Sequence, residues 1–211
     1  MKISVIMPTV DWPIGSGLPH QFFKKSICSV LAAGHDDFQL LIGGDGTLPA
    51  VRAAAESFAD HRIRYIDFPR TRNFGNNQRH ELMKTLVEGE LFGFMDHDDA
   101  YVPGALKIMH DDCVAAGVPI VFGATLPLCW AQQDGNLRDL ALGIQAQRIA
   151  TQAMISPVMD GMPLWPNVEA FDADFTYAQH VTSWCNERGT PAMRSTFITT
   201  LIRPWLRKPS R

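Results

Sequence analysis

The sequence predicts an α/β fold with a mainly parallel central sheet flanked by helices. Short apolar runs alternate with segments of helical periodicity from the N-terminus to about residue 124, which is the pattern of repeated strand–helix units. Polar residues stand directly after several of these runs, as Thr9, Asp45 and the cluster Asp96–Asp99. Because ligands of such sheets bind beyond the carboxyl ends of the strands, these residues predict a binding site at that edge.

Each element of the first half has a local reason. The strands are short runs rich in Ile, Val, Leu and Phe, and Pro, Gly or acidic residues end them. The helices carry apolar residues three and four positions apart, with Gly34 placed to end the first and Pro103 to open the last. In chain order we expect strand Ile3–Met7, helix His20–Ala33, strand Phe38–Ile42, helix Leu48–Ala59, strand Ile63–Asp67, helix Asn76–Glu88, strand Leu91–Met95, helix Pro103–Ala116 and strand Ile120–Ala124.

The second half of the sequence is less regular. A high density of Pro and Gly predicts a loop over Ser156–Asn167. We expect a helix within Arg138–Met154, a helix at Asp172–Glu187, a strand at Ser195–Ile202 and an exposed basic tail from Arg203 to Arg211. The length of 211 residues, without a repeat or a low-complexity linker, predicts a single domain covering residues 1–211.

Composition excludes several classes of protein. A hydrophobic fraction of 46% supplies a full core and argues against disorder, and a net charge of −3 disfavours a nucleic-acid binder. The four cysteines have no CxxC pattern, which indicates free thiols in a reducing compartment. We find no targeting segment and no membrane-spanning run, so we expect a cytoplasmic protein. The basic tail would allow peripheral contact with a membrane.

The cluster Asp96-His97-Asp98-Asp99 is the strongest chemical signal. Three carboxylates in four positions repel one another unless a cation lies between them. Mn²⁺ or Mg²⁺ fits this role, since these ions bind one or two carboxylates and complete their shell with water and phosphate oxygens. The alternative is an acidic turn before Pro103, and we favour the metal site because functional groups gather at strand ends.

Five segments of the first 110 residues follow one another in a recognisable order: Ile3–Thr9, Lys25–Leu31, Phe38–Thr47, Asn73–His80 and Gly89–Asp99. Together they resemble the family-2 glycosyltransferases, which have the nucleotide-diphospho-sugar transferase fold called GT-A. The resemblance implies one GT-A-like domain. Residues 1–110 would be its nucleotide-sugar-binding half and residues 111–211 its acceptor-binding half.

The resemblance also implies which residues hold the nucleotide. Thr9 and Asp45 would hold the base, Arg79 would lie near the nucleotide, and Asp96 would reach the ribose. One departure stands out, because the family's usual Asp-Asp-Gly-Ser begins here with Gly44. One contact with the base or the ribose is therefore expected to be absent.

Other carboxylates are expected to bind the metal and to transfer the proton. By resemblance, Asp98 would bind the metal that bridges the diphosphate, and Asp99 would bind the same ion or support its ligands. In the family a Glu-Asp pair opens a helix beneath the acceptor. Here Phe171 replaces the Glu, so Asp172 takes the position of the catalytic base, with Asp174 as the alternative. Both could instead only cap the helix.

The function expected from these observations is inverting, metal-dependent transfer of one sugar from a nucleotide-diphosphate sugar to an acceptor hydroxyl. Donor sugars linked to UDP, GDP or dTDP are all compatible with the sequence. The acceptor is a glycan, a lipid-linked molecule or a protein. Two alternatives stay open. One is a nucleotide-sugar-binding module with weak or no turnover, and the other is a Mg²⁺-dependent phosphatase of the haloacid-dehalogenase type, which also places Asp-x-Asp after a buried strand.

Overall fold

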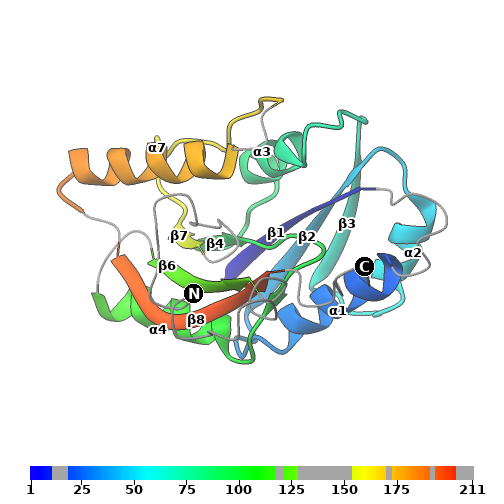
Figure 1. Ribbon diagram of the computed structural model, residues 1–211, viewed down its shortest axis with the longest axis horizontal. Helices are drawn as coiled ribbons and strands as arrows, with labels where there is room; N and C mark the ends of the chain where they lie inside the picture. Colours follow the sequence, from blue (N-terminus) through cyan, green and yellow to red (C-terminus); the bar gives the residue numbers. More distant parts are fainter. Residues whose placement is uncertain (11–18, 117–120, 128–153, 170–172, 191–192, 203–211) are drawn as a thin grey trace, which may run out of the picture.

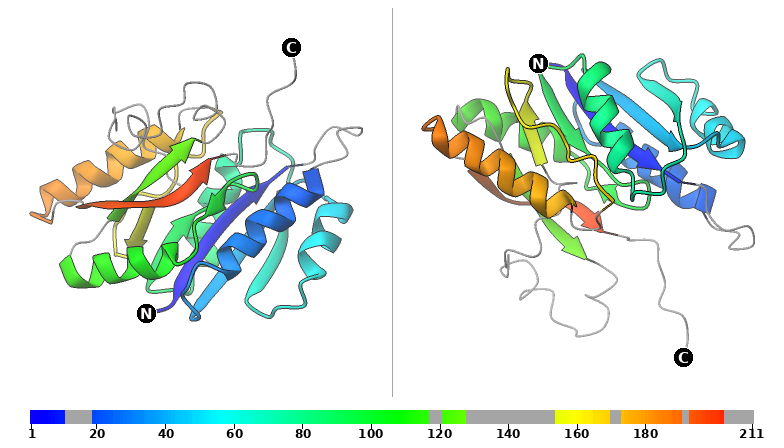
Figure 2. Two further views of the ribbon diagram at one scale, coloured as in Figure 1. Left: turned by 60° about the horizontal axis from the view of Figure 1, so that its bottom comes forward. Right: turned by 90° about the horizontal axis from the view of Figure 1, so that it is seen from above.

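The computed structural model describes residues 1–10, 19–116, 121–127, 154–169, 173–190 and 193–202. These residues form a single central sheet with helices on both of its faces (Figures 1 and 2). The predicted α/β class is therefore confirmed.

The sheet contains eight strands. They are β1 (Ile3–Thr9), β2 (Phe38–Asp45), β3 (Ile63–Phe68), β4 (Leu91–Phe94), β5 (Ala100–Tyr101), β6 (Val121–Pro127), β7 (Met154–Pro157) and β8 (Met193–Ile202). Their order across the sheet is β3-β2-β1-β4-β7-β6-β8-β5. The four strands β3, β2, β1 and β4 run parallel, and so do β6 and β8. Strand β7 lies antiparallel between β4 and β6, and β5 is antiparallel to β8.

Helices cover the sheet in two layers. They are α1 (Pro19–Leu31), α2 (Pro49–Glu56), α3 (Asn76–Thr85), α4 (Ala105–Ala116) and α7 (Ala173–Glu187). Figure 1 shows α3 and α7 above the sheet and α1 and α4 below it. The lower layer and the upper layer enclose separate hydrophobic clusters.

Strand β1 shows how the sequence builds both layers. Its side chains alternate between the two faces of the sheet, as the period of a strand requires. Val5 and Met7 belong to the lower cluster with Phe23 of α1, whereas Ile6 belongs to the upper cluster with Tyr177 of α7. All seven residues of β1 are buried, so this strand is the centre of the fold.

The predicted order of strands and helices in the first half is confirmed, with ends within three residues of those expected. Two strands were not predicted. Residues Met154–Pro157 form β7, where we expected the end of a helix and the start of a loop, and Ala100–Tyr101 form the two-residue strand β5. The helix expected within Arg138–Met154 and the tail Arg203–Arg211 lie outside the described residues.

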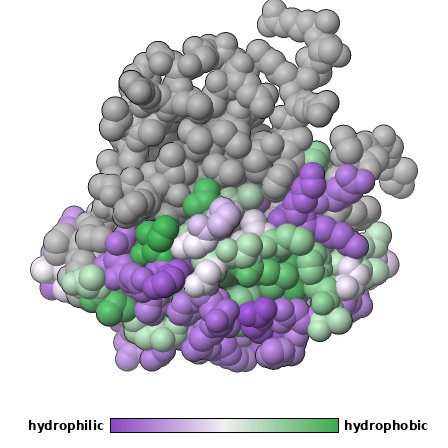
Figure 3. Space-filling view, turned by 90° about the horizontal axis from the view of Figure 1, so that it is seen from below, coloured by the Kyte–Doolittle hydropathy of each residue, from purple (hydrophilic) through white to green (hydrophobic). Residues whose placement is uncertain are grey.

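The outer surface of the lower layer mixes hydrophobic and hydrophilic residues (Figure 3). Such a mixture is usual for helices that bury only one side. Within the part of the chain that the structure describes, no helix is both long enough and apolar enough to cross a lipid bilayer.

Candidate active site

The acidic cluster lies at the carboxyl end of β4, where the sequence placed it. Asp96, Asp98 and Asp99 each direct a carboxylate oxygen to within 4.8 Å of the others. Asp99 is buried, and the other two are partly exposed. Oxygen ligands at this spacing suit Mn²⁺ or Mg²⁺, so the residues present fit such an ion.

Helix α1 holds the turn that carries these carboxylates. The buried Ser26 hydroxyl lies 2.9 Å from the carbonyl oxygen of His97 and 2.5 Å from that of Asp99. At the beginning of the turn, the Tyr101 hydroxyl donates to the carbonyl of Phe94 over 2.9 Å. Burial raises the pKa of Tyr101, so this hydroxyl keeps its proton and stays a donor. These contacts fix the backbone of the cluster from below.

Arg79 of α3 forms an ion pair with Asp96. The guanidinium also donates to the carbonyl of Phe74 over 3.0 Å and stacks on the Trp165 ring at 4.7 Å. The Arg79 side chain is only 7% exposed, so it supports the site from behind more than it projects into solvent. Three carboxylates and one guanidinium leave a net charge of −2 in the cluster, which one divalent cation would neutralise.

Asp45, at the end of β2, organises the loop after β3. Its Oδ1 accepts hydrogen bonds from the backbone N–H of Thr71 at 2.6 Å and from the side-chain amide of Gln78 at 3.1 Å. Its Oδ2 accepts from the N–H of Arg72 at 2.9 Å. Arg72 adopts a positive φ of 56°, which these bonds help to maintain. Among the described residues Oδ2 has this one partner, so the oxygen keeps capacity for a further donor such as a base N–H.

The end of β1 lies between these two groups. Thr9 pairs in register with Gly44, and its buried hydroxyl has no hydrogen-bond partner among the described residues. Packing explains why residue 44 is a glycine, because a Cβ at this position would collide with the Tyr65 hydroxyl of β3. The missing Asp of the family's pattern is therefore replaced in space by a tyrosine side chain.

Hydrogen bonds hold a segment after β7 against α3 and the loop before it, beside the cluster. The side-chain amide of Asn73 donates to Asn167 over 3.1 Å, and that of Asn76 donates to the carbonyl of Val168 over 2.8 Å. Figure 2 shows this segment, in yellow, running beside α3. Trp165 of the same segment is buried, so it packs in the interior and does not offer an exposed ring to a sugar.

Of the two candidate bases, the structure describes one. Asp174 lies in the first turn of α7, and Asp172 lies outside the described residues. Tyr177, one turn further along α7, stacks on Trp165 at 5.0 Å. The beginning of α7 is thereby anchored to the same aromatic group that supports Arg79.

Sequence reasoning did not identify Ser26, Gln78, Tyr101 or Trp165 as supports of the site. Ser26 carried a usable signal, since it is a polar residue between the apolar residues Phe23 and Ile27 of an amphipathic helix. The others depend on contacts between distant parts of the chain.

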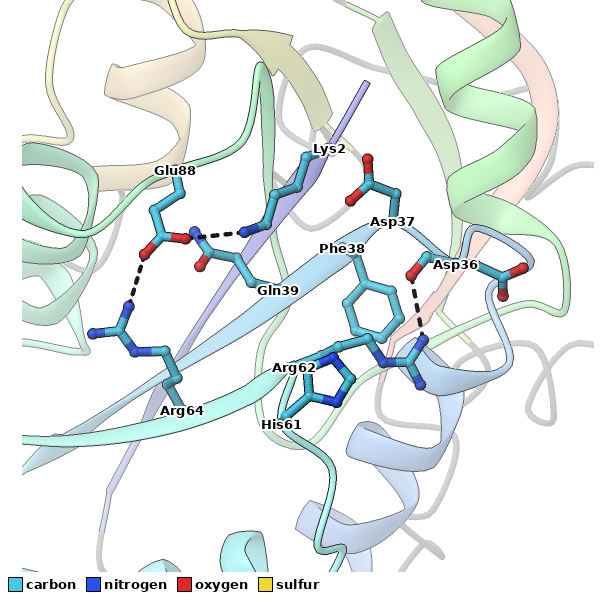
Figure 4. Close-up of a pocket in the computed structure, with 9 residues that line it drawn as sticks. All are labelled: Lys2, Asp36, Asp37, Phe38, Gln39, His61, Arg62, Arg64 and Glu88. Carbon is cyan, nitrogen blue, oxygen red and sulfur yellow. Dashed lines mark hydrogen bonds and ion pairs between the residues drawn. The ribbon is translucent and has the colours of Figure 1, made fainter.

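A hollow lies at the opposite ends of the strands, away from the acidic cluster (Figure 4). It is lined by charged residues around the beginnings of β1, β2 and β3. Lys2 pairs with Glu88 at 2.9 Å, and Glu88 also pairs with Arg64 at 3.1 Å. Because its charges are matched and it lies away from the carboxyl ends, we do not assign the active site to it.

Comparison with known proteins supports the assignment of the fold. Residues 4–137 match the family model Glycosyl transferase family 2, so the chain belongs to that family. No curated protein matches the sequence.

Similar solved structures share the GT-A fold. The crystal structure of TarS from S. aureus has a TM-score of 0.70 and 13% identity, over 96% of this chain and 36% of that one. TarS 1–349 in complex with UDP-GlcNAc has a TM-score of 0.70 and 13% identity, over 95% of this chain and 58% of that one. The mannosyltransferase PcManGT from Pyrobaculum calidifontis, in complex with GDP-Man and Mn²⁺, has a TM-score of 0.66 and 12% identity, over 94% and 56%. The chain thus spans less than two thirds of the length of these structures.

Proposed function

We propose that this protein is an inverting, metal-dependent glycosyltransferase that moves one sugar from a nucleotide-diphosphate sugar to an acceptor hydroxyl. The observation that carries the proposal is the convergence of three carboxylates at the end of β4, in a chain that belongs to Glycosyl transferase family 2. Similar folds have been solved with UDP-GlcNAc and with GDP-Man and Mn²⁺, which supports a nucleotide-sugar donor.

In this proposal, Asp98 and Asp99 hold the divalent ion. When bound, Mn²⁺ or Mg²⁺ would stabilise the negative charge that grows on the departing diphosphate. Asp96, which forms an ion pair with Arg79, would reach the ribose.

The nucleotide base would lie over the ends of β1 and β2. Asp45 Oδ2 accepts from a base N–H, and the Thr9 hydroxyl supplies a second polar contact. Both groups are buried, and the hydroxyl has no hydrogen-bond partner among the described residues. A ligand that bonds to this hydroxyl would remove the cost of leaving a buried polar group unsatisfied.

Transfer of the sugar needs one carboxylate that acts as a general base. Asp172, or Asp174 in its place, removes the proton of the acceptor hydroxyl as that oxygen bonds to the anomeric carbon. The bond from the anomeric carbon to the diphosphate oxygen breaks at the same time, and the nucleoside diphosphate leaves with the electron pair. One displacement on the face opposite the leaving group inverts the anomeric configuration. The acceptor is a hydroxyl of a glycan, a lipid-linked molecule or a protein.

Slow hydrolysis of the donor tests this function without knowledge of the acceptor. We would incubate the protein with UDP-glucose, UDP-GlcNAc or GDP-mannose and Mn²⁺, and record the first-formed anomer by ¹H NMR. The proposal predicts that an α-linked donor gives the β-anomer, that EDTA stops the reaction, and that Asp98→Asn abolishes it.

The matched control is Asp160→Asn, which removes an exposed carboxylate in the segment after β7. This variant should behave as wild type. Retention of configuration would contradict the inverting mechanism, and binding of a nucleotide sugar without any turnover would favour a binding module. Dominant release of inorganic phosphate would favour a phosphatase.

A further inference from the structure

Three residues on one face of α3 contact Trp165. They are Asn76, Arg79 and His80, at helical positions i, i+3 and i+4, which lie side by side on a helix. The indole N–H of Trp165 donates to Asn76 Oδ1 over 2.9 Å, and the Trp165 carbonyl lies 2.7 Å from the His80 ring. The indole face lies 4.7 Å from the Arg79 guanidinium. Trp165 is therefore held in one orientation against the helix.

The same indole limits where Arg79 can go. An arginine side chain has many rotamers, and fixing it in one costs conformational entropy. Here the Trp165 ring covers one side of the guanidinium, the Phe74 carbonyl accepts from Nη1, and Asp96 accepts from Nη2. The aromatic ring thus selects the rotamer from which Arg79 reaches Asp96.

The Trp165 ring is also held by aromatic residues outside α3. Its ring meets Phe94 at 4.7 Å and Tyr177 at 5.0 Å, and only 1% of the residue is exposed. Phe94 ends β4, and Asp96 follows two residues later. The indole therefore touches both the strand that carries the acidic cluster and the helix that carries its arginine.

We propose that Trp165 is a positioning residue for donor binding. It acts through Arg79 on Asp96 and makes no contact of its own with the nucleotide. This inference rests on the proposed function, in which Asp96 reaches the ribose. It assigns part of the donor site to a residue outside the first 110 residues, beyond the half of the chain to which donor binding was ascribed.

The test measures the affinity of the full-length protein for UDP, GDP and dTDP at saturating Mn²⁺, by isothermal titration calorimetry. Trp165→Leu removes the aromatic face and should lower the affinity for the preferred nucleotide about tenfold. Asn76→Ala removes the acceptor of the indole N–H together with the hydrogen bond to the Val168 carbonyl. It leaves the core filled and should weaken binding about threefold. This second variant keeps the proposal testable even if Trp165→Leu folds poorly.

Trp184→Leu is the matched control. Trp184 lies in α7, is 9% exposed, and belongs to the same hydrophobic cluster. Its ring stacks against Arg188, whose guanidinium lies 4.1 Å away, and not against Arg79. It should lower the melting temperature as Trp165→Leu does, with nucleotide affinity unchanged. A purely structural role for Trp165 would make the two leucine variants behave alike.

A double-mutant cycle tests the route through Arg79. In an Arg79→Ala background, Trp165→Leu should cause no further loss of nucleotide affinity. A full tenfold loss in that background would overturn the proposal, and so would wild-type affinity in both Trp165→Leu and Asn76→Ala. If wild type binds none of the three nucleotides, the proposed function fails together with this inference, and that result differs from a wild type that binds while its variants are unaffected.

Discussion

Removal of one buried hydroxyl should loosen the acidic turn. Ser26 is 0% exposed, and its Oγ lies 2.9 Å and 2.5 Å from two carbonyl oxygens of the turn. The hydroxyl carries one hydrogen, so Ser26→Ala removes one hydrogen bond and leaves a buried carbonyl less well satisfied. Such a change costs about 2 kcal/mol of unfolding free energy. For a chain of this size it lowers the melting temperature by about 6 °C.

The same variant should weaken Mn²⁺ binding. Asp98 and Asp99 stand on the backbone that Ser26 holds, so a looser turn pays an entropic cost when the metal gathers its ligands. We expect an affinity about five- to tenfold lower, measured by electron paramagnetic resonance of free Mn²⁺ during titration, which corresponds to about 1 to 1.4 kcal/mol.

Ser57→Ala is the control, since Ser57 donates to a carbonyl at the exposed end of α2 over 2.8 Å and is remote in sequence from the cluster. It should change Mn²⁺ affinity by less than about twofold. Wild-type Mn²⁺ affinity in Ser26→Ala would refute the reasoning, whatever the change in melting temperature.

Three further predictions concern stability. Asp45→Ala removes the acceptor of two backbone N–H groups and one side-chain amide, and should lower the unfolding free energy by about 3 kcal/mol in urea titrations. Gly75→Ala places a Cβ 2.6 Å from Pro8 at a φ of +81° and should cost more than Gly104→Ala, which has the same φ of +81° and open space around it. Hydrogen bonds from Arg62 lower the pKa of Asp60 to about 2. The contribution of the ionised Asp60 to the free energy of unfolding is therefore complete above pH 4 and is lost as the pH falls through 2. After allowance for solvent screening this amounts to about 1 kcal/mol, and urea midpoints of an Asp60→Asn variant should lack that part of the acid dependence.

The parallel half of the fold could be predicted from the sequence because local signals suffice there. Ile3–Thr9 and Phe38–Asp45 are mostly apolar runs that are buried along their whole length, and the helix between them keeps one apolar side. Strand β7 gave no such signal, since its four residues are too few to show a period and contain a proline at the end. Strand β5 has two residues, and only its pairing with β8 defines it.

The candidate site was predictable in its charges but not in its supports. The carboxylates after β4 and at the end of β2 follow from chain position, because strand ends meet at one edge of a parallel sheet. The contact of Ser26 with Asp99 spans 73 residues, and that of Trp165 with Asn76 spans 89 residues. No local periodicity reports contacts of this kind, since they depend on how distant elements pack together.

The most direct test of the account is calorimetric titration of UDP, GDP and dTDP into wild type and Asp98→Asn, each with and without Mn²⁺. The account predicts that wild type binds one nucleotide well, that this binding needs Mn²⁺, and that Asp98→Asn loses it. Nucleotide binding that is equally tight without metal, or in Asp98→Asn, would contradict the assignment of the acidic cluster as the metal-binding donor site.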